Sequence, residues 1–261
     1  MKSLLSLLTF GLLAATAVAA DKPDTRLFEM RVYFAAEGKL DALNARLRDH
    51  TLKLFEKHGM TNLGYFVPTK NTENKLVYFL AYADRAARDA SWKAFGADPA
   101  WKAAQKASEL NGKLITKVES AFLTATDYAV LAEAKSYGKG VFELRTYTTE
   151  AGRLENLNAR FRDHTLKLFE KQGMTNMTYW NLAADQKGTK NTYVAGNTLI
   201  YLLHHQSEEA AKASFDAFRA DPAWVAAKEA SEKKAGGSLT VAQPNGVKSE
   251  FLIPTDYSPV K

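Results

Sequence analysis

The chain is organised around a stretch that occurs twice, Asn44-Ala45-Arg46-Leu47-Arg48-Asp49-His50-Thr51-Leu52-Lys53-Leu54-Phe55-Glu56-Lys57. It returns at Asn158 to Lys171 with a single change, Phe161 in place of Leu47. Around it, residues 27–66 and 141–180 are identical at 25 of 40 positions, at an offset of 114. A repeat this long contains whole helices and strands. It therefore indicates a tandem domain duplication and not a solenoid.

Within each copy, the hydrophobic pattern alternates between strand and helix periods. Residues 27–34 alternate in steps of two, as a strand does, and the repeated stretch carries apolar residues at helical spacing. Asp98-Pro99 predicts a helix start, with Asp as the N-cap and Pro in the first turn. In the first copy the other expected elements are strands at 62–67, 76–83 and 119–124 and a helix at 84–95.

The resulting order, β-α-β-β-α-β, is that of a ferredoxin-like unit. One such unit has an antiparallel sheet with helices on one face, and its other face needs cover. The second copy can supply that cover. We therefore predict an α+β protein with two tandem ferredoxin-like domains, at residues 26–128 and 141–258, which form one pseudo-symmetric barrel. Residues 129–140 are the predicted linker.

Residues 1–20 resemble a secretory signal peptide of the Sec type. A short basic start, Met1-Lys2, precedes an apolar run from Leu4 to Ala14 and the small residues Ala17 to Ala20. The run is short for a spanning helix, although an uncleaved anchor is the alternative. The chain has no cysteine, so no lipobox is present. We expect a periplasmic or secreted protein with no membrane segment after cleavage.

Composition narrows the function classes further. The formal charge of +6 is spread among acidic neighbours without a basic stripe, so we do not expect nucleic-acid binding. No catalytic or phosphate-binding motif stands out. His204 and His205 are adjacent on a predicted strand and point to opposite faces, so they cannot bind one metal ion together. We predict no metal site.

The candidate ligand-binding residues lie on the first strand of each copy. The apolar Phe28, Met30 and Val32 alternate with polar neighbours. These are Glu29, Arg31 and Tyr33, matched in the second copy by Glu143, Arg145 and Tyr147. We expect the polar set to project away from the helices and to line the barrel interior. It would form either a polar pocket for a small molecule or a structural ion-pair network that fixes the two sheets together.

Two histidines in the repeated stretch complete the candidate set. His50 and His164 lie at the edge of the apolar stripe of their helices. Each could serve as a general base or a haem ligand in a cleft between helix and sheet, or could simply donate to a backbone carbonyl at the boundary between the apolar and charged helix faces.

A known family matches these residues. Phe142 to Tyr147, His164, Gly173, Tyr179-Trp180 and Ala220 to Trp224 together resemble the NIPSNAP domain. The first copy resembles it at Phe28 to Tyr33, His50, Gly59, Tyr65-Phe66 and Ala97 to Trp101. The resemblance implies a dimeric α+β barrel, in agreement with the predicted order of elements. It implies no particular reaction.

The leading functional hypothesis is an exported protein that binds a small molecule or a protein partner through its barrel. The alternative is an oxygenase or isomerase, either cofactor-independent or haem-linked, because similar barrels carry such chemistry. A structural or assembly module is a third hypothesis. No cofactor is expected outside the haem-linked version. Because both copies are in one chain, we expect a monomer whose barrel is an intramolecular pseudo-dimer.

Overall fold

The computed structural model of the protein describes residues 24–129, 136–186 and 195–261. The predicted signal peptide lies outside these residues, as does part of the predicted linker. None of the described helices is long and apolar enough to cross a membrane.

The two halves repeat the same series of elements. In the first half these are β1 (Leu27–Ala35), α1 (Leu40–Arg46), η1 (Leu47–Thr51), α2 (Leu52–Lys57), β2 (Thr61–Pro68), β3 (Lys75–Tyr82), α3 (Arg85–Ala97), α4 (Pro99–Ser108) and β4 (Ile115–Ala125). In the second half they are β5 (Val141–Thr148), α5 (Leu154–Arg160), η2 (Phe161–Thr165), α6 (Leu166–Lys171), β6 (Thr175–Leu182), β7 (Thr198–His205), α7 (Glu208–Ala220), α8 (Pro222–Ala235) and β8 (Val247–Pro254). The β-α-β-β-α-β order is confirmed in both domains.

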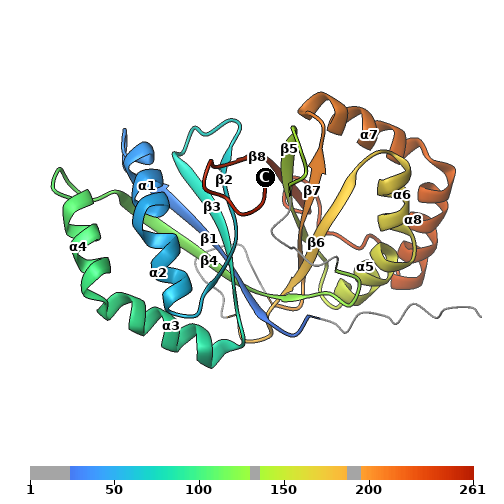
Figure 1. Cartoon of the computed structure of the whole chain (residues 1–261). Helices are drawn as coiled ribbons and strands as arrows, with labels where there is room; N and C mark the ends of the chain where they lie inside the picture. The colour runs from blue at the N-terminus through green and yellow to red at the C-terminus, as the bar shows by residue number, and fades with distance from the viewer. Residues whose placement is uncertain (1–23, 130–135, 187–194) are drawn as a thin grey trace, which may run out of the picture.

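The eight strands close into one antiparallel barrel in the order β1-β3-β2-β8-β5-β7-β6-β4. Each domain contributes four neighbouring strands, and the seams between domains are β2–β8 and β4–β6. The helices of the two domains cover opposite outer sides of the barrel (Figure 1). The predicted fold class, two tandem units in a pseudo-symmetric α+β barrel, is confirmed.

The prediction of which strand face lines the barrel is wrong. The barrel interior holds the apolar set, with Phe28, Met30 and Val32 packed against Phe142 and Leu144 of the other domain. The polar set lies on the outer face of the sheet, under the helices. An eight-stranded barrel is only wide enough for side chains to fill it, so an apolar interior is the stable arrangement. Charged residues of the sheet are stable under the helices because polar side chains of the helix layer can pair with them.

The repeated stretch is not one continuous α-helix. Its middle five residues, Leu47–Thr51, form a π-helical turn, η1, and η2 matches it in the second domain. A π turn contains more residues than an α turn, so it rotates the rest of the helix. Leu43, Leu47 and Phe55, at repeated spacings of four or eight, therefore all face the core. Leu54, which the regular period places on the buried stripe, is only partly buried.

The C-terminal end of each domain forms ion pairs and hydrogen bonds with the other domain. Asp127 forms an ion pair with Arg162 at 2.7 Å, and the Tyr128 hydroxyl donates to Asn158 at 2.9 Å. The second copy repeats both contacts toward the first domain: these are Asp256 with Arg48 at 2.8 Å and Tyr257 with Asn44 at 2.7 Å. We call these four pairs the exchanged contacts. They explain why the Thr-Asp-Tyr ends and the repeated stretch are alike in both copies.

Candidate functional site

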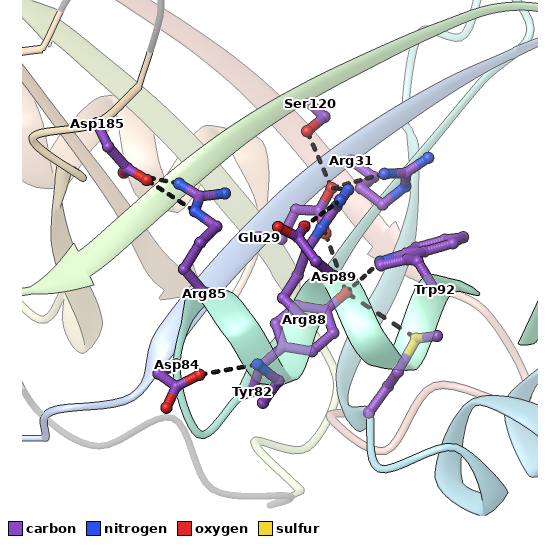
Figure 2. A network of polar contacts seen from close by, with 12 residues as sticks. Glu29, Arg31, Tyr82, Asp84, Arg85, Arg88, Asp89, Trp92, Ser120 and Asp185 are labelled. Carbon is purple, nitrogen blue, oxygen red and sulfur yellow. Dashed lines mark hydrogen bonds and ion pairs between the residues drawn. The ribbon is translucent and has the colours of Figure 1, made fainter. Parts of the chain in front are cut away.

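The candidate polar residues form two matched networks, one in each domain, between the barrel wall and the helix layer. In the first domain the centre is Glu29 on β1, whose side chain is fully buried. Its carboxylate accepts hydrogen bonds from side chains on four different elements (Figure 2). The donors are Arg31 at 2.6 Å, Tyr82 at 2.9 Å, Ser120 at 2.9 Å and both arms of the Arg88 guanidinium at 3.0 and 3.1 Å.

In the second domain Glu143 on β5 occupies the matching place and has fewer partners. Among the described residues it accepts from two side chains, Arg145 at 2.5 Å and His205 at 3.0 Å. His205 replaces Tyr82, since both stand opposite the first residue of the adjacent strand in the sheet register. Glu143 is as deeply buried as Glu29, with 2% of its side chain exposed.

The main difference between the two networks lies on the helix above each one. Aligning α3 with α7 at an offset of 123 places Ala211 where the first domain has Arg88, and Glu208 where it has Arg85. In the first domain both arginines lie over the Phe122 ring, at 3.4 Å for Arg85 and 4.9 Å for Arg88. In the second domain neither guanidinium is present.

A surface cleft of about 450 Å³ opens at this place in the second domain. It is lined by the deeply buried Glu143 and the largely buried Arg145, which we call its floor, and by the rings of Phe215 on α7 and Phe251 on β8, which we call its walls. Ala211 lies in the wall from α7, and Glu208 and Glu209 lie at the start of the same helix. The cleft is within the range of a small-ligand site, which combines apolar walls with a few converging polar groups.

The floor of the cleft carries two opposite charges. Burial alone raises the pKa of Glu143, but the hydrogen bond with His205 and the charge of Arg145 outweigh it and lower the pKa below its ordinary value. Glu29 behaves in the same way, because burial is outweighed by Arg31 and Arg88. Both carboxylates are therefore ionised at neutral pH.

The tyrosines of the predicted set support the arginines. The Arg145 Nε group donates to the Tyr201 hydroxyl at 3.0 Å, and the guanidinium lies 4.3 Å from the Phe215 ring centre. Tyr147 packs against Tyr201, with ring centres 5.6 Å apart. In the first domain Tyr33 packs edge-on against Tyr78 at 5.0 Å. Tyr33 and Tyr147 therefore help to position the site but form no part of the cleft floor.

His50 and His164 are not part of either network. Both lie in the π-helical turns with exposed side chains, so of the two alternatives for them, a place in a cleft between helix and sheet is wrong. The π turn directs Thr51 and Thr165 inward instead, where each hydroxyl donates to the backbone carbonyl five residues earlier. A haem ligand needs a histidine facing a large cavity. Neither residue meets that requirement, so these two histidines do not fit the haem-linked alternative.

The candidate set missed Arg88, Ala211 and His205. The signal for them was the alignment of the copies, which pairs Arg88 with Ala211 and Tyr82 with His205. A position where one copy has a charged residue and the other does not indicates a difference between the two sites. The expected divergence of His204 and His205 holds, because His204 packs against Phe142 on the barrel side.

Two other cavities have less to offer a ligand. An apolar cleft of about 300 Å³ lies beside α1 and α4 in the first domain, and two of its three charged members, Arg46 and Glu109, pair with each other at 3.0 Å. A cavity of about 420 Å³ at one end of the barrel is rimmed by lysines and glutamates, among which Lys75 pairs with Glu250 at 2.5 Å.

Comparison with known proteins places the chain by sequence and by fold. The NIPSNAP family model matches residues 28–130 and 142–259. An uncharacterised NIPSNAP domain protein from Burkholderia xenovorans is 27% identical over 38% of this chain and 94% of its own, with a TM-score of 0.34. No curated protein matches the chain in sequence.

Two solved structures resemble the whole barrel. An anthrone oxidase-like protein is 14% identical over 91% of this chain and 94% of its own, with a TM-score of 0.52. A Lactobacillus acidophilus protein that carries the provisional name monooxygenase is 12% identical over 88% of this chain and 94% of its own, with a TM-score of 0.53. At these identities the likeness shows the shared fold alone.

Proposed function

Because this chain belongs to the NIPSNAP family and closes its barrel with two NIPSNAP domains, we propose that it binds a small molecule in the cleft of the second domain. The ligand rests on Glu143 and Arg145, between Phe215 and Phe251. The matching place in the first domain is occupied by Arg88, which bonds Glu29, and serves as scaffold. The two alternatives for the polar residues, pocket and ion-pair network, are thus divided between the domains.

The observation that carries this proposal is the exchange of Arg88 for Ala211. A buried carboxylate is stable only when it is paired and hydrogen-bonded. The first domain meets that requirement with its own side chains. The second domain keeps the carboxylate buried, removes a cation that bonds it in the first copy, and leaves a cleft where that cation would lie. The Glu143 carboxylate is already desolvated in the folded protein, so a ligand that pairs with it adds little further cost on the carboxylate side.

Binding is better supported than proton transfer at this site. An efficient general base has a pKa near the working pH. The pKa of Glu143 is instead lowered by its contacts with His205 and Arg145. A carboxylate held in its charged form by an arginine orients and binds a ligand more readily than it accepts a proton.

The alternative is a cofactor-independent oxygenase or isomerase. It is supported by the shared fold with an anthrone oxidase-like protein, which is an argument by analogy. Beneath the cleft, the Glu143–His205 contact at 3.0 Å joins two groups that acid–base chemistry could use. Replacing His205 by Tyr, the residue of the first domain, would abolish such a reaction but retain ligand binding.

Native mass spectrometry of protein purified gently from its own compartment tests the proposal. We expect an added mass on the wild-type protein that is lost in Ala211→Arg, which rebuilds the closed arrangement of the first domain. Ala213→Arg, which adds the same charge at an exposed position of α7, should retain the added mass. An added mass that persists in Ala211→Arg would place the ligand elsewhere and refute the proposal.

We further propose that the protein is exported and monomeric. Export is supported by the leader-like residues 1–20. A monomer is supported by the barrel, which the two domains close within one chain. Light scattering of the purified protein should give the mass of one chain, and a dimer would mean that the domains pair between chains.

A further inference from the structure

We propose that the ligand of the second-domain cleft carries a planar cation of the guanidinium or amidinium class. In the first domain, the Arg88 guanidinium occupies the place that this cation takes in the second. The Arg88 side chain therefore serves in the first domain as an internal counterpart of the ligand. Its guanidinium group indicates the chemical class of the molecule that binds in the second domain. This inference rests on the proposed function and specifies the class of ligand.

The first step is an account of the carboxylate oxygens. An ionised carboxylate has about four lone-pair sites, and Glu29 uses its capacity fully with five donated hydrogen bonds. Arg88 supplies two of these through Nε and Nη2, a forked contact of the kind that suits a carboxylate. Glu143 accepts two hydrogen bonds in all from the described residues. Its unused capacity matches a forked donor.

The second step concerns the aromatic wall. Phe122 stands opposite Glu29 in the sheet register, and Phe251 stands opposite Glu143 in the same way. Phe122 lies under the guanidinium groups of Arg85 and Arg88, and both contacts are within the range of a cation–π interaction. Phe251 lines the open cleft instead. The ring that holds a cation in the first domain is therefore available to one from outside in the second.

The third step is the charge at the mouth of the cleft. Two acidic residues, Glu208 and Glu209, occupy positions that are Arg85 and Ala86 in the first domain. Two basic residues also line the cleft, but Lys212 and Arg219 both pair with Asp216 on the same helix, at 2.8 and 2.5 Å. The change from Arg85 to Glu208 reverses one charge beside the aromatic wall. It makes the mouth more attractive to a cation.

A pair of matched compounds tests the class of ligand directly. Benzamidine carries a planar cation at neutral pH, and benzamide has nearly the same shape without the charge. In calorimetric titrations of the wild-type protein, we expect benzamidine to bind at one site and benzamide to bind at least about tenfold more weakly, since a forked charge-assisted contact is worth more than about 1.4 kcal/mol.

Three variants locate that site. Ala211→Arg places a guanidinium inside the second cleft and should abolish benzamidine binding, whereas the exposed change Ala213→Arg should leave it intact. Arg88→Ala opens the first domain and exposes Glu29 and Phe122, so the number of benzamidine sites should rise from one to two. The Arg88→Ala variant keeps the test decisive even if Ala211→Arg does not fold.

The outcomes separate this inference from the proposed function. If benzamide binds as tightly as benzamidine and both are lost in Ala211→Arg, the cleft binds ligands but the cation class is wrong. If benzamidine binds equally well to wild type and Ala211→Arg, both the cation site and its location are wrong. If neither compound binds at millimolar concentration while the native ligand is retained, the guanidinium class is overturned and the cleft as a ligand site stands.

Discussion

Replacing Arg31 and Arg145 by Met tests the difference between the two domains in a matched pair. The two arginines have almost the same surroundings: their side chains are 12% and 13% exposed, and they contact their glutamates at 2.6 and 2.5 Å. Each Nε donates to a tyrosine, Tyr78 or Tyr201, at 2.9 or 3.0 Å. Met fills a similar volume, so the interactions lost are nearly equal.

What remains after each change is different. In Arg31→Met, Glu29 keeps the charge of Arg88 and two hydroxyl donors, so we expect a loss of about 1.5–3 kcal/mol, the value of hydrogen bonds to a charged group. In Arg145→Met, Glu143 keeps only His205 among the described residues. An uncompensated buried charge costs about 3–5 kcal/mol. Arg145→Met should therefore be less stable than Arg31→Met by more than about 1 kcal/mol.

Urea unfolding at neutral pH measures both losses, with equal m-values as the sign that the unfolded states are alike. Lowering the pH should narrow the gap, because protonation removes the unpaired charge of Glu143 in Arg145→Met. Adding Ala211→Arg to Arg145→Met should restore part of the stability by supplying a second guanidinium. Equal losses in the two single variants would refute the view that the second domain lacks a partner that the first domain has.

Three further predictions follow from the same contacts. Arg88→Ala should lower the free energy of unfolding by about 1.5–3 kcal/mol, measured by urea unfolding, because Glu29 loses two charged hydrogen bonds but keeps Arg31. The pKa values of Glu29 and Glu143 are lowered on folding, so their stabilisation is present above their unfolded pKa and is lost as the pH falls through the folded pKa; urea midpoints that rise toward acid pH would contradict this. Tyr128→Phe should cost about 0.5–1.5 kcal/mol in a thermal melt by removing the bond to Asn158 between the domains, and an unchanged melt would show that this exchanged contact contributes nothing.

The architecture could be predicted from the sequence because the repeat carries it. Strand and helix periods, the Asp98-Pro99 helix start and the matching ends of the copies all have local causes. Gly59 and Gly173, which follow the helices of the repeated stretch, both adopt the left-handed conformation with φ of 79°, as a helix C-terminus favours for glycine. Asp98 caps α4 by accepting from the Ala100 amide at 2.8 Å.

The orientation of the first strand could not be predicted in the same way. Alternation separates Phe28 and Met30 from Glu29 and Arg31, but both faces of the sheet are covered, one by helices and one by the other domain. The usual rule that polar residues face away from the packed layer then fails. The deciding residues, Tyr82 and Arg88, lie far along the chain, and their role appears only when the sheet register brings them to Glu29.

The π-helical turns also could not be predicted from the period of the apolar residues. A period of 3.6 places Leu54 inside, whereas the structure buries Phe55. The spacing of Leu43, Leu47, Thr51 and Phe55, four residues each time, is the trace that a wider turn leaves in the sequence. The same turn explains why His50 faces solvent and not the cleft.

The most direct test of the central claim is a crystal structure of the protein grown with benzamidine. We predict one molecule in the second domain, with its amidinium facing Glu143 and its ring against Phe251, and none at Glu29. Density in the apolar cleft of the first domain or at the end of the barrel, with the second-domain cleft empty, would contradict the account.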